Sequence, residues 1–188
     1  MCFSAQSQIS GGAQLSYFNL FNFTSSPGIG IKGFYAQSDK IMGYGGINFY
    51  PGGKREFDDF VFNGSGESKT VVGTSKIAIF NLEVGGRYYF VGGVEETLGV
   101  YGGVSVAFIG FRLNTEYEQH GDPNYAEQES VSEFVSGPAM IGHVGAEYNL
   151  GFGSVFLDAN IGIPANRAGE TEVQVNFGAF AQIDAGVR

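Results

Sequence analysis

The chain has 188 residues, the length of a single domain, with 31 Gly and only 15% charged residues, against about 25% in typical soluble domains. The formal charge of −9 argues against nucleic-acid binding, which needs clustered Lys and Arg. The lone Cys2 excludes a disulfide framework and a Cys-based metal site, and no stretch of about 18 residues is apolar enough for a membrane helix.

The first residues, MCFSAQSQ, resemble the end of a secretory signal. They include small residues of the kind found near a cleavage site, but the basic and long apolar parts of such a signal are absent. We therefore assign residues 1–7 to a signal-peptide remnant and residues 8–188 to one β-barrel domain.

From residue 8 onwards, apolar and polar residues alternate with the period of two that is specific to a β-strand. In the segment 77–90, Leu82 and Val84 fall on one face, whereas Glu83 and Arg87 fall on the other. Patterns of this kind predict eight strands, at residues 8–18, 28–36, 40–50, 77–90, 97–117, 134–150, 155–163 and 173–188.

Short and long connections alternate between the predicted strands. The short ones are residues 37–39, 91–96 and 151–154, and the long, more polar ones are residues 19–27, 51–76, 118–133 and 164–172. This asymmetry is typical of a transmembrane barrel, with short turns on the periplasmic rim and long loops outside. With eight strands, both termini fall on the short-turn rim, and we expect them to be periplasmic.

Alternation alone does not decide which face lies inside, because a soluble lipocalin-like barrel also has eight strands, with its apolar face around a ligand. Here the polar face is rich in small residues such as Gly103 and Ser105, as a narrow interior requires, and the apolar face has almost no charge. An aromatic girdle of the kind that flanks a membrane is predicted at Tyr88, Tyr89, Phe90 and Tyr148. We therefore predict an all-β fold, an eight-stranded antiparallel transmembrane β-barrel.

Four segments carry a resemblance to a known family: residues 81–90 (NLEVGGRYYF), 101–108 (YGGVSVAF), 141–150 (IGHVGAEYNL) and 181–188 (AQIDAGVR). The chain resembles the small porin-like outer-membrane β-barrels of Gram-negative bacteria, of the OmpA/OmpX-type architecture. The resemblance covers nearly the whole chain and rests on pattern, not on an invariant motif. It implies contact with outer-membrane lipid and lipopolysaccharide, and insertion by the barrel-assembly machinery. Such barrels normally end in an aromatic residue that this machinery reads, whereas this chain ends in Arg188.

Charged residues gather on the polar face, towards the short-turn end of the predicted barrel. The predicted lumen polar network consists of Lys32, Glu83, Arg87, His143, Glu147, Asp158, Asn160, Gln182, Asp184 and Arg188. An isolated charge in a narrow interior is costly, so both signs are required. Because eight strands leave room for little more than side chains, we interpret the network as structural. The alternative is a gate or proton-sensitive plug in which His143 titrates.

The sequence gives little support for catalysis, metal binding or phosphate binding. A Ser–His hydrolase would need Ser136 and His143 on one face, but parity puts them on opposite faces unless residues 137–138 form a bulge. Residues 116–133 hold six carboxylates and no Lys or Arg, yet their spacing matches no EF-hand loop. No Gly-rich segment has the context of a phosphate loop. We therefore predict no catalytic residue, no metal site and no cofactor.

The long connections 51–76 and 118–133 are the predicted surface for an external ligand. The first contains Phe57, Phe60 and Phe62, and exposed aromatic residues in a surface loop can form an adhesive patch. The sequence predicts a non-enzymatic outer-membrane barrel with a structural or surface-interaction role. The alternatives are a narrow porin-like channel for small solutes and a soluble lipocalin-like barrel that binds a lipophile.

Overall fold

The computed structural model describes residues 8–20, 24–118, 121–125, 127–164 and 180–188. Within these ranges no helix is long and apolar enough to cross a membrane. The described residues form nine strands: β1 (Gln8–Leu20), β2 (Thr24–Ala36), β3 (Ile41–Tyr50), β4 (Lys54–Phe62), β5 (Ser68–Val91), β6 (Leu98–Tyr117), β7 (Val131–Asn149), β8 (Ser154–Pro164) and β9 (Phe180–Val187).

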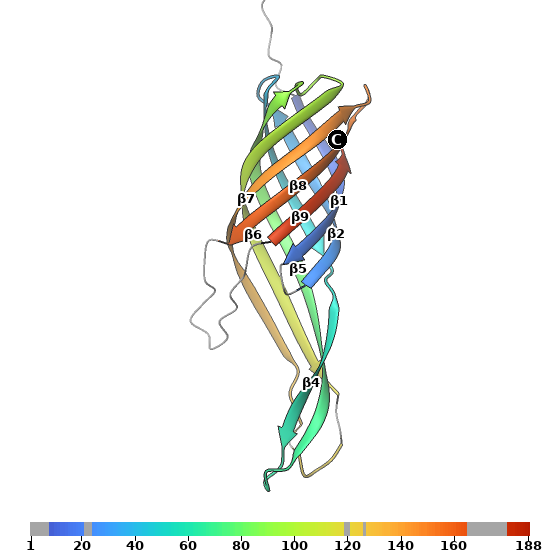
Figure 1. Ribbon diagram of the computed structural model, residues 1–188, viewed down its shortest axis with the longest axis vertical. Coiled ribbons are helices and arrows are strands. Elements are labelled where there is room, and N and C mark those ends of the chain that lie inside the picture. The colour runs from blue at the N-terminus through green and yellow to red at the C-terminus, as the bar shows by residue number, and fades with distance from the viewer. Residues whose placement is uncertain (1–7, 21–23, 119–120, 126, 165–179) are drawn as a thin grey trace, which may run out of the picture.

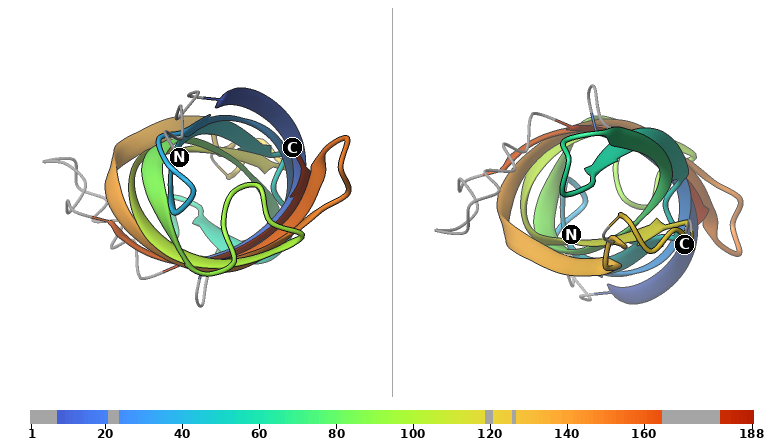
Figure 2. Two further views of the ribbon diagram at one scale, coloured as in Figure 1. Left: turned by 90° about the horizontal axis from the view of Figure 1, so that it is seen from above. Right: turned by 90° about the horizontal axis from the view of Figure 1, so that it is seen from below.

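Eight of these strands close into an antiparallel barrel (Figure 1), and Figure 2 shows the ring from both ends. Around the ring the order is β1, β2, β3, β5, β6, β7, β8 and β9, and β9 pairs with β1 again. The remaining strand, β4, pairs with β5 alone among the described strands. The predicted eight-stranded antiparallel barrel is therefore confirmed.

The segment 51–76 is not the loop that the sequence predicts. β4 pairs with the first part of β5, from Lys54 opposite Lys76 to Phe62 opposite Ser68, and a turn at residues 63–67 joins them. This hairpin, which we call the arm (residues 54–76), continues the barrel wall for about 30 Å along the strands and projects from the end opposite Arg188 (Figure 1). The alternation was hidden because five of the nine β4 residues are charged.

The predicted long connection 19–27 is also mostly strand. β1 continues to Leu20 and β2 begins at Thr24, and these two residues are cross-strand partners. The prediction was wrong because Ser25, Ser26 and Pro27 are residues that favour turns. Here tertiary contacts override that preference: the buried Ser26 hydroxyl accepts a hydrogen bond from the backbone N–H of Gly52 at 3.0 Å.

The outer surface of the barrel is apolar. Val84, Val104 and Val144 expose 60%, 68% and 60% of their surface, although they lie in the middle of long strands. On β5 the outward-facing apolar residues run from Ala78 to Phe90, about 40 Å of strand. For a strand tilted by about 45° this gives an apolar band close to the roughly 25 Å expected for a membrane-spanning barrel. An apolar exterior over a polar interior excludes the soluble lipocalin-like alternative.

The predicted aromatic girdle is wrong for one residue. Tyr88, Phe90 and Tyr148 are exposed on the outer surface, but Tyr89 is 1% exposed and points into the lumen. The reason is the period of two, since three consecutive residues of a strand cannot share one face. A second group of outward aromatic rings lies towards the arm, where Phe80 stacks on Phe134 with 5.8 Å between ring centroids.

Candidate functional site

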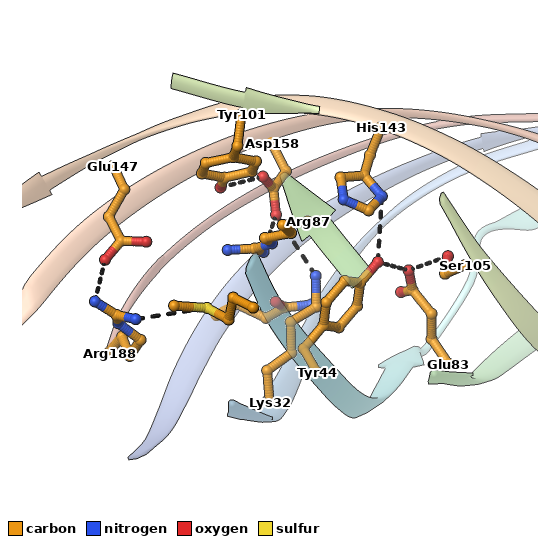
Figure 3. A network of polar contacts seen from close by, with 12 residues as sticks. Lys32, Tyr44, Glu83, Arg87, Tyr101, Ser105, His143, Glu147, Asp158 and Arg188 are labelled. Carbon is orange, nitrogen blue, oxygen red and sulfur yellow. Dashed lines mark hydrogen bonds and ion pairs between the residues drawn. The ribbon is translucent and has the colours of Figure 1, made fainter. Parts of the chain in front are cut away.

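Arg87 is the centre of a buried polar cluster in the half of the lumen nearer the short turns (Figure 3). Its Nη2 donates to Oδ2 of Asp158 at 2.7 Å, and Lys32 Nζ lies 3.6 Å from the same oxygen. The hydroxyl of Tyr101 donates to Oδ1 of Asp158, and the Tyr101 ring lies 4.4 Å from the guanidinium carbon. The charged side chains are almost inaccessible to solvent, so the attraction between Asp158 and the two cations is only weakly screened.

Glu83 lies next to this cluster and accepts two hydrogen bonds. The hydroxyls of Tyr44 and Ser105 both donate to its Oε1 at 2.6 Å, and the Tyr44 oxygen is also 3.2 Å from Nδ1 of His143. The imidazole fits because residue 103 of the neighbouring strand is Gly: a Cβ there would lie 2.3 Å from His143 Nε2 and 2.1 Å from a backbone oxygen.

A third group closes the lumen at the short-turn rim. Arg188 Nη2 lies 2.5 Å from Oε1 of Glu147 and 3.2 Å from the carbonyl oxygen of Val94. The hydroxyl of Tyr89 donates to the other Glu147 oxygen at 2.9 Å. The carboxylate is therefore held by a cation on one side and a phenol on the other.

The structure brings most of the predicted site residues together inside the barrel. Lys32, Glu83, Arg87, His143, Glu147, Asp158 and Asn160 are buried, and Arg188 is partly buried. The side chains of Gln182 and Asp184 lie outside the described part of the chain. The backbone register sets Asp184 opposite Asp158 on one side and Ser16 on the other.

Sequence reasoning missed the aromatic members of this network. Tyr44, Tyr89 and Tyr101 supply three of its hydroxyl donors, whereas the sequence analysis places Tyr89 in the aromatic girdle and assigns no role to Tyr44 and Tyr101. Parity was the signal that could have found them. Tyr101 shares its face with Gly103 and Ser105, which were already assigned to the lumen.

Further towards the arm, the polar network gives way to an amide layer and then to an apolar plug. Gln14, Asn48 and Asn81 form the amide layer across neighbouring strands, and Gln14 Nε2 donates to Asn48 Oδ1. Gly30 makes this possible, because a Cβ there would lie 1.8 Å from Asn48 Oδ1. The plug consists of Phe18, Tyr50, Ile77, Ile79, Ala107, Ile109, Phe111, Ala139 and Ile141.

The plug was not expected from the sequence, because the apolar class was assigned to the lipid. In the run Ile77–Ala78–Ile79–Phe80 every residue is apolar, which is the signal of a strand in apolar surroundings on both faces. Ile79 is fully buried, and the rings of Phe18 and Tyr50 lie 5.2 Å apart. Apolar side chains therefore fill this half of the lumen.

The described residues do not assemble a recognisable catalytic site. Ser136 is on the outer side of β7 and His143 on its inner side, in an uninterrupted register, so they do not form a pair. Ser105, the serine of the buried cluster, donates its hydroxyl to Glu83. Among the described residues, no three His, Cys, Asp or Glu side chains are grouped so that they could hold a metal ion.

The acidic connection after β6 folds against the arm. Residues Asn63 and Tyr125 form an isolated β-bridge, and Lys69 Nζ lies 3.5 Å from Asp122 and 5.7 Å from the Tyr125 ring centroid. Hydrogen bonds from the backbone and side chain of Asn124, together with Lys69, lower the pKa of Asp122. The arm and this connection thus form one projecting structure.

These features define a class of protein: a transmembrane β-barrel with a filled lumen and a projecting β-hairpin. No protein-family model matches the sequence, and no curated protein is significantly similar to it. Solved structures share the fold.

Ail, the attachment invasion locus protein of Yersinia pestis, was solved in complex with the heparin analogue sucrose octasulfate. It aligns with a TM-score of 0.50 at 13% identity, over 96% of this chain and 95% of that chain. Neisserial surface protein A (NspA) aligns with a TM-score of 0.54 at 12% identity, over 95% of this chain and 93% of that chain. Both are small eight-stranded outer-membrane barrels of the OmpA/OmpX type, so the predicted architecture is confirmed at the level of the fold.

Proposed function

We propose that this chain is a non-enzymatic barrel of the Gram-negative outer membrane, with a structural and surface-interaction role and with its short turns and termini in the periplasm. The observation that carries this proposal is the filled lumen. Among the described residues, large buried side chains fill the lumen from Arg188 at one rim to Phe111 near the other. The barrel then acts as a membrane anchor, and the arm is the part available to a partner.

Single-channel conductance distinguishes this proposal from the alternative of a narrow channel for small solutes. The refolded full chain is inserted into planar lipid bilayers, and we expect no single-channel steps above the baseline of protein-free bilayers. Discrete steps that change when Glu83 or Arg87 is replaced by Ala would establish a channel and overturn the proposal.

Two observations support a role for the arm in surface interaction. It extends beyond the apolar band, and its edge strand β4 pairs on one side only among the described strands. A structural neighbour, Ail, was solved with a heparin analogue bound, so this fold is compatible with ligand binding. We infer that connections 51–76 and 118–133 together form the interaction surface.

An arm-trimmed variant tests this role. Arg55 and Ser75 are cross-strand partners, so residues 56–74 can be replaced by Asn-Gly, which favours a two-residue hairpin turn. Bacteria that display the full chain and the trimmed chain in equal amounts are compared for adhesion to cultured cells. We expect adhesion above the empty-vector level only with the full chain, and equal adhesion by both would contradict the role of the arm.

A further inference from the structure

The outer face of β4 carries acidic and aromatic side chains that the fold does not use. Val61 is buried on the inner face of the arm, so the even-numbered residues of β4 point outwards. Of these, Glu56 and Asp58 are exposed, and Phe60 and Phe62 expose 56% and 64% of their surface. Four consecutive outward positions thus present two carboxylates followed by two aromatic rings.

Two of the four cations of the arm form ion pairs with residues outside it. Lys76 Nζ lies 3.0 Å from Glu116, and Lys69 lies 3.5 Å from Asp122. The other two, Lys54 and Arg55, are exposed at the base of the arm, and Lys54 lies on the same outward face as Glu56. Within the described part of the chain, no Lys or Arg forms an ion pair with Glu56 or Asp58. Their negative charge is therefore available to a partner.

The backbone of β4 favours an extended partner. The N–H of Asn63 donates to the carbonyl of Glu67, so the odd-numbered residues direct their backbone groups towards β5. Those of the even-numbered residues then point to the open edge. The N–H of Phe60 accordingly donates to the side chain of Asp59, at 2.8 Å. The even-numbered residues of β4 therefore send their carboxylates and rings to the outer face and their backbone groups to the open edge.

We propose that the outer face of β4 docks a cationic polypeptide segment in an extended conformation, with Lys or Arg alternating with apolar residues. This inference rests on the proposed function, in which the arm is the interaction surface. Alternate side chains of an extended chain are about 6.6 Å apart, the same spacing as Glu56, Asp58, Phe60 and Phe62 along β4. Cationic side chains meet the carboxylates, and Arg also stacks favourably on Phe rings. A sulfated polysaccharide carries the wrong charge for this face.

The test uses a fluorescein-labelled peptide in which Lys alternates with Val, titrated with the full refolded chain in neutral detergent and followed by fluorescence anisotropy. We expect roughly tenfold weaker binding for the double variant Glu56→Lys, Asp58→Lys and for Phe60→Ser, Phe62→Ser. The matched control is Glu127→Lys, Glu129→Lys, which makes the same change of charge at two exposed residues of the neighbouring connection. We expect the control to bind like the unmodified chain.

The inference is overturned if the control weakens binding as much as the β4 variants do, because attraction would then be non-specific. It is also overturned if the unmodified chain does not bind the peptide, or binds a Glu–Val peptide equally well. If the arm-trimmed chain loses binding while both β4 variants keep it, the arm binds but its outer β4 face does not. If the trimmed chain retains full binding, the arm itself is not the interaction surface. Gel mobility before and after boiling verifies that each variant is folded.

Discussion

Asp158 is the residue on which the buried charges of the lumen depend. It is the only described carboxylate that forms ion pairs with both Lys32 and Arg87. A buried ion pair contributes little net stability compared with an apolar replacement, but loss of one partner leaves an uncompensated charge. The network therefore tolerates removal of its cations better than removal of this carboxylate.

Replacing Asp158 with Asn should lower the free energy of unfolding by about 3–5 kcal/mol, because Arg87 and Lys32 lose a shared carboxylate partner in a buried site. Urea unfolding in liposomes, followed by gel mobility, measures the change. Glu116→Gln is the control, since the exposed Glu116–Lys76 pair should contribute less than about 1 kcal/mol. Equal effects of the two substitutions would show that the network is hydrated.

Gly103 is required by close packing and not by backbone conformation. A Cβ at this position would lie 2.1 Å from the carbonyl oxygen of Gly86 and 2.3 Å from His143 Nε2. We expect Gly103→Ala to destabilise the barrel by about 1–3 kcal/mol, the usual cost of overpacking. Gly137→Ala serves as the comparison, because a Cβ there meets nothing within 4 Å, and its unfolding midpoint in urea should stay close to that of the unmodified chain.

At the scale of the element, β5 combines two functions in one strand of 24 residues. Residues 77–91 pair with β3 and β6 and send Glu83 and Arg87 into the lumen, whereas residues 68–76 pair with β4 in the arm. The barrel half of β5 has an apolar outward face, whereas the arm half has both polar and apolar residues. The boundary between them coincides with the interruption between β3 and β4 at residues 51–53.

We expect the arm-trimmed chain to fold like the full chain, because residues 56–74 contribute no side chain to the polar network, the amide layer or the plug. The measurements are circular dichroism in detergent and the mobility shift on boiling, compared with the full chain. A trimmed chain that refolds only partly or loses the shift would mean that the arm helps the barrel to close.

At the scale of the whole molecule, the lumen holds a polar network and an apolar plug, and the outer surface of the barrel is apolar. This arrangement is stable only where hydrocarbon, and not water, covers the outer surface. Membrane lipid therefore covers the apolar outer face of the barrel, and the inner face is buried by packing within the lumen.

The exposed Val84 lies within the apolar band, so Val84→Arg should cost about 2–4 kcal/mol of folding free energy in liposomes, as expected for a charge near the bilayer centre. Ser132→Arg introduces the same charge at an exposed, outward-facing residue at the start of β7, beyond the band, and should cost about 0–1 kcal/mol. Both are measured by urea unfolding. Similar costs at the two positions would argue against a lipid boundary between them.

The sequence alone determined the face on which each strand residue lies. A period of two assigns Glu83, Arg87, His143 and Asp158 to one side of the wall and Val84 and Val144 to the other, and the structure keeps these assignments. It also determined the number of barrel strands and their antiparallel order, because short and long links limit the ways in which neighbouring strands can pair. Where this reasoning failed, as for Tyr89 and residues 19–27, residue type was weighed above position.

Only the tertiary structure decided which side chains meet. Arg87 and Asp158 are 71 residues apart, and no local pattern sets the stagger with which a barrel closes. The closed barrel decides the partners of Glu83 and Arg188, and it places the apolar plug next to the amide layer on the side of the arm. It also determines that β4 and the first part of β5 extend beyond the apolar band as one hairpin. The physical reason is that alternation is a property of each strand, whereas contact across the lumen depends on the register of all eight.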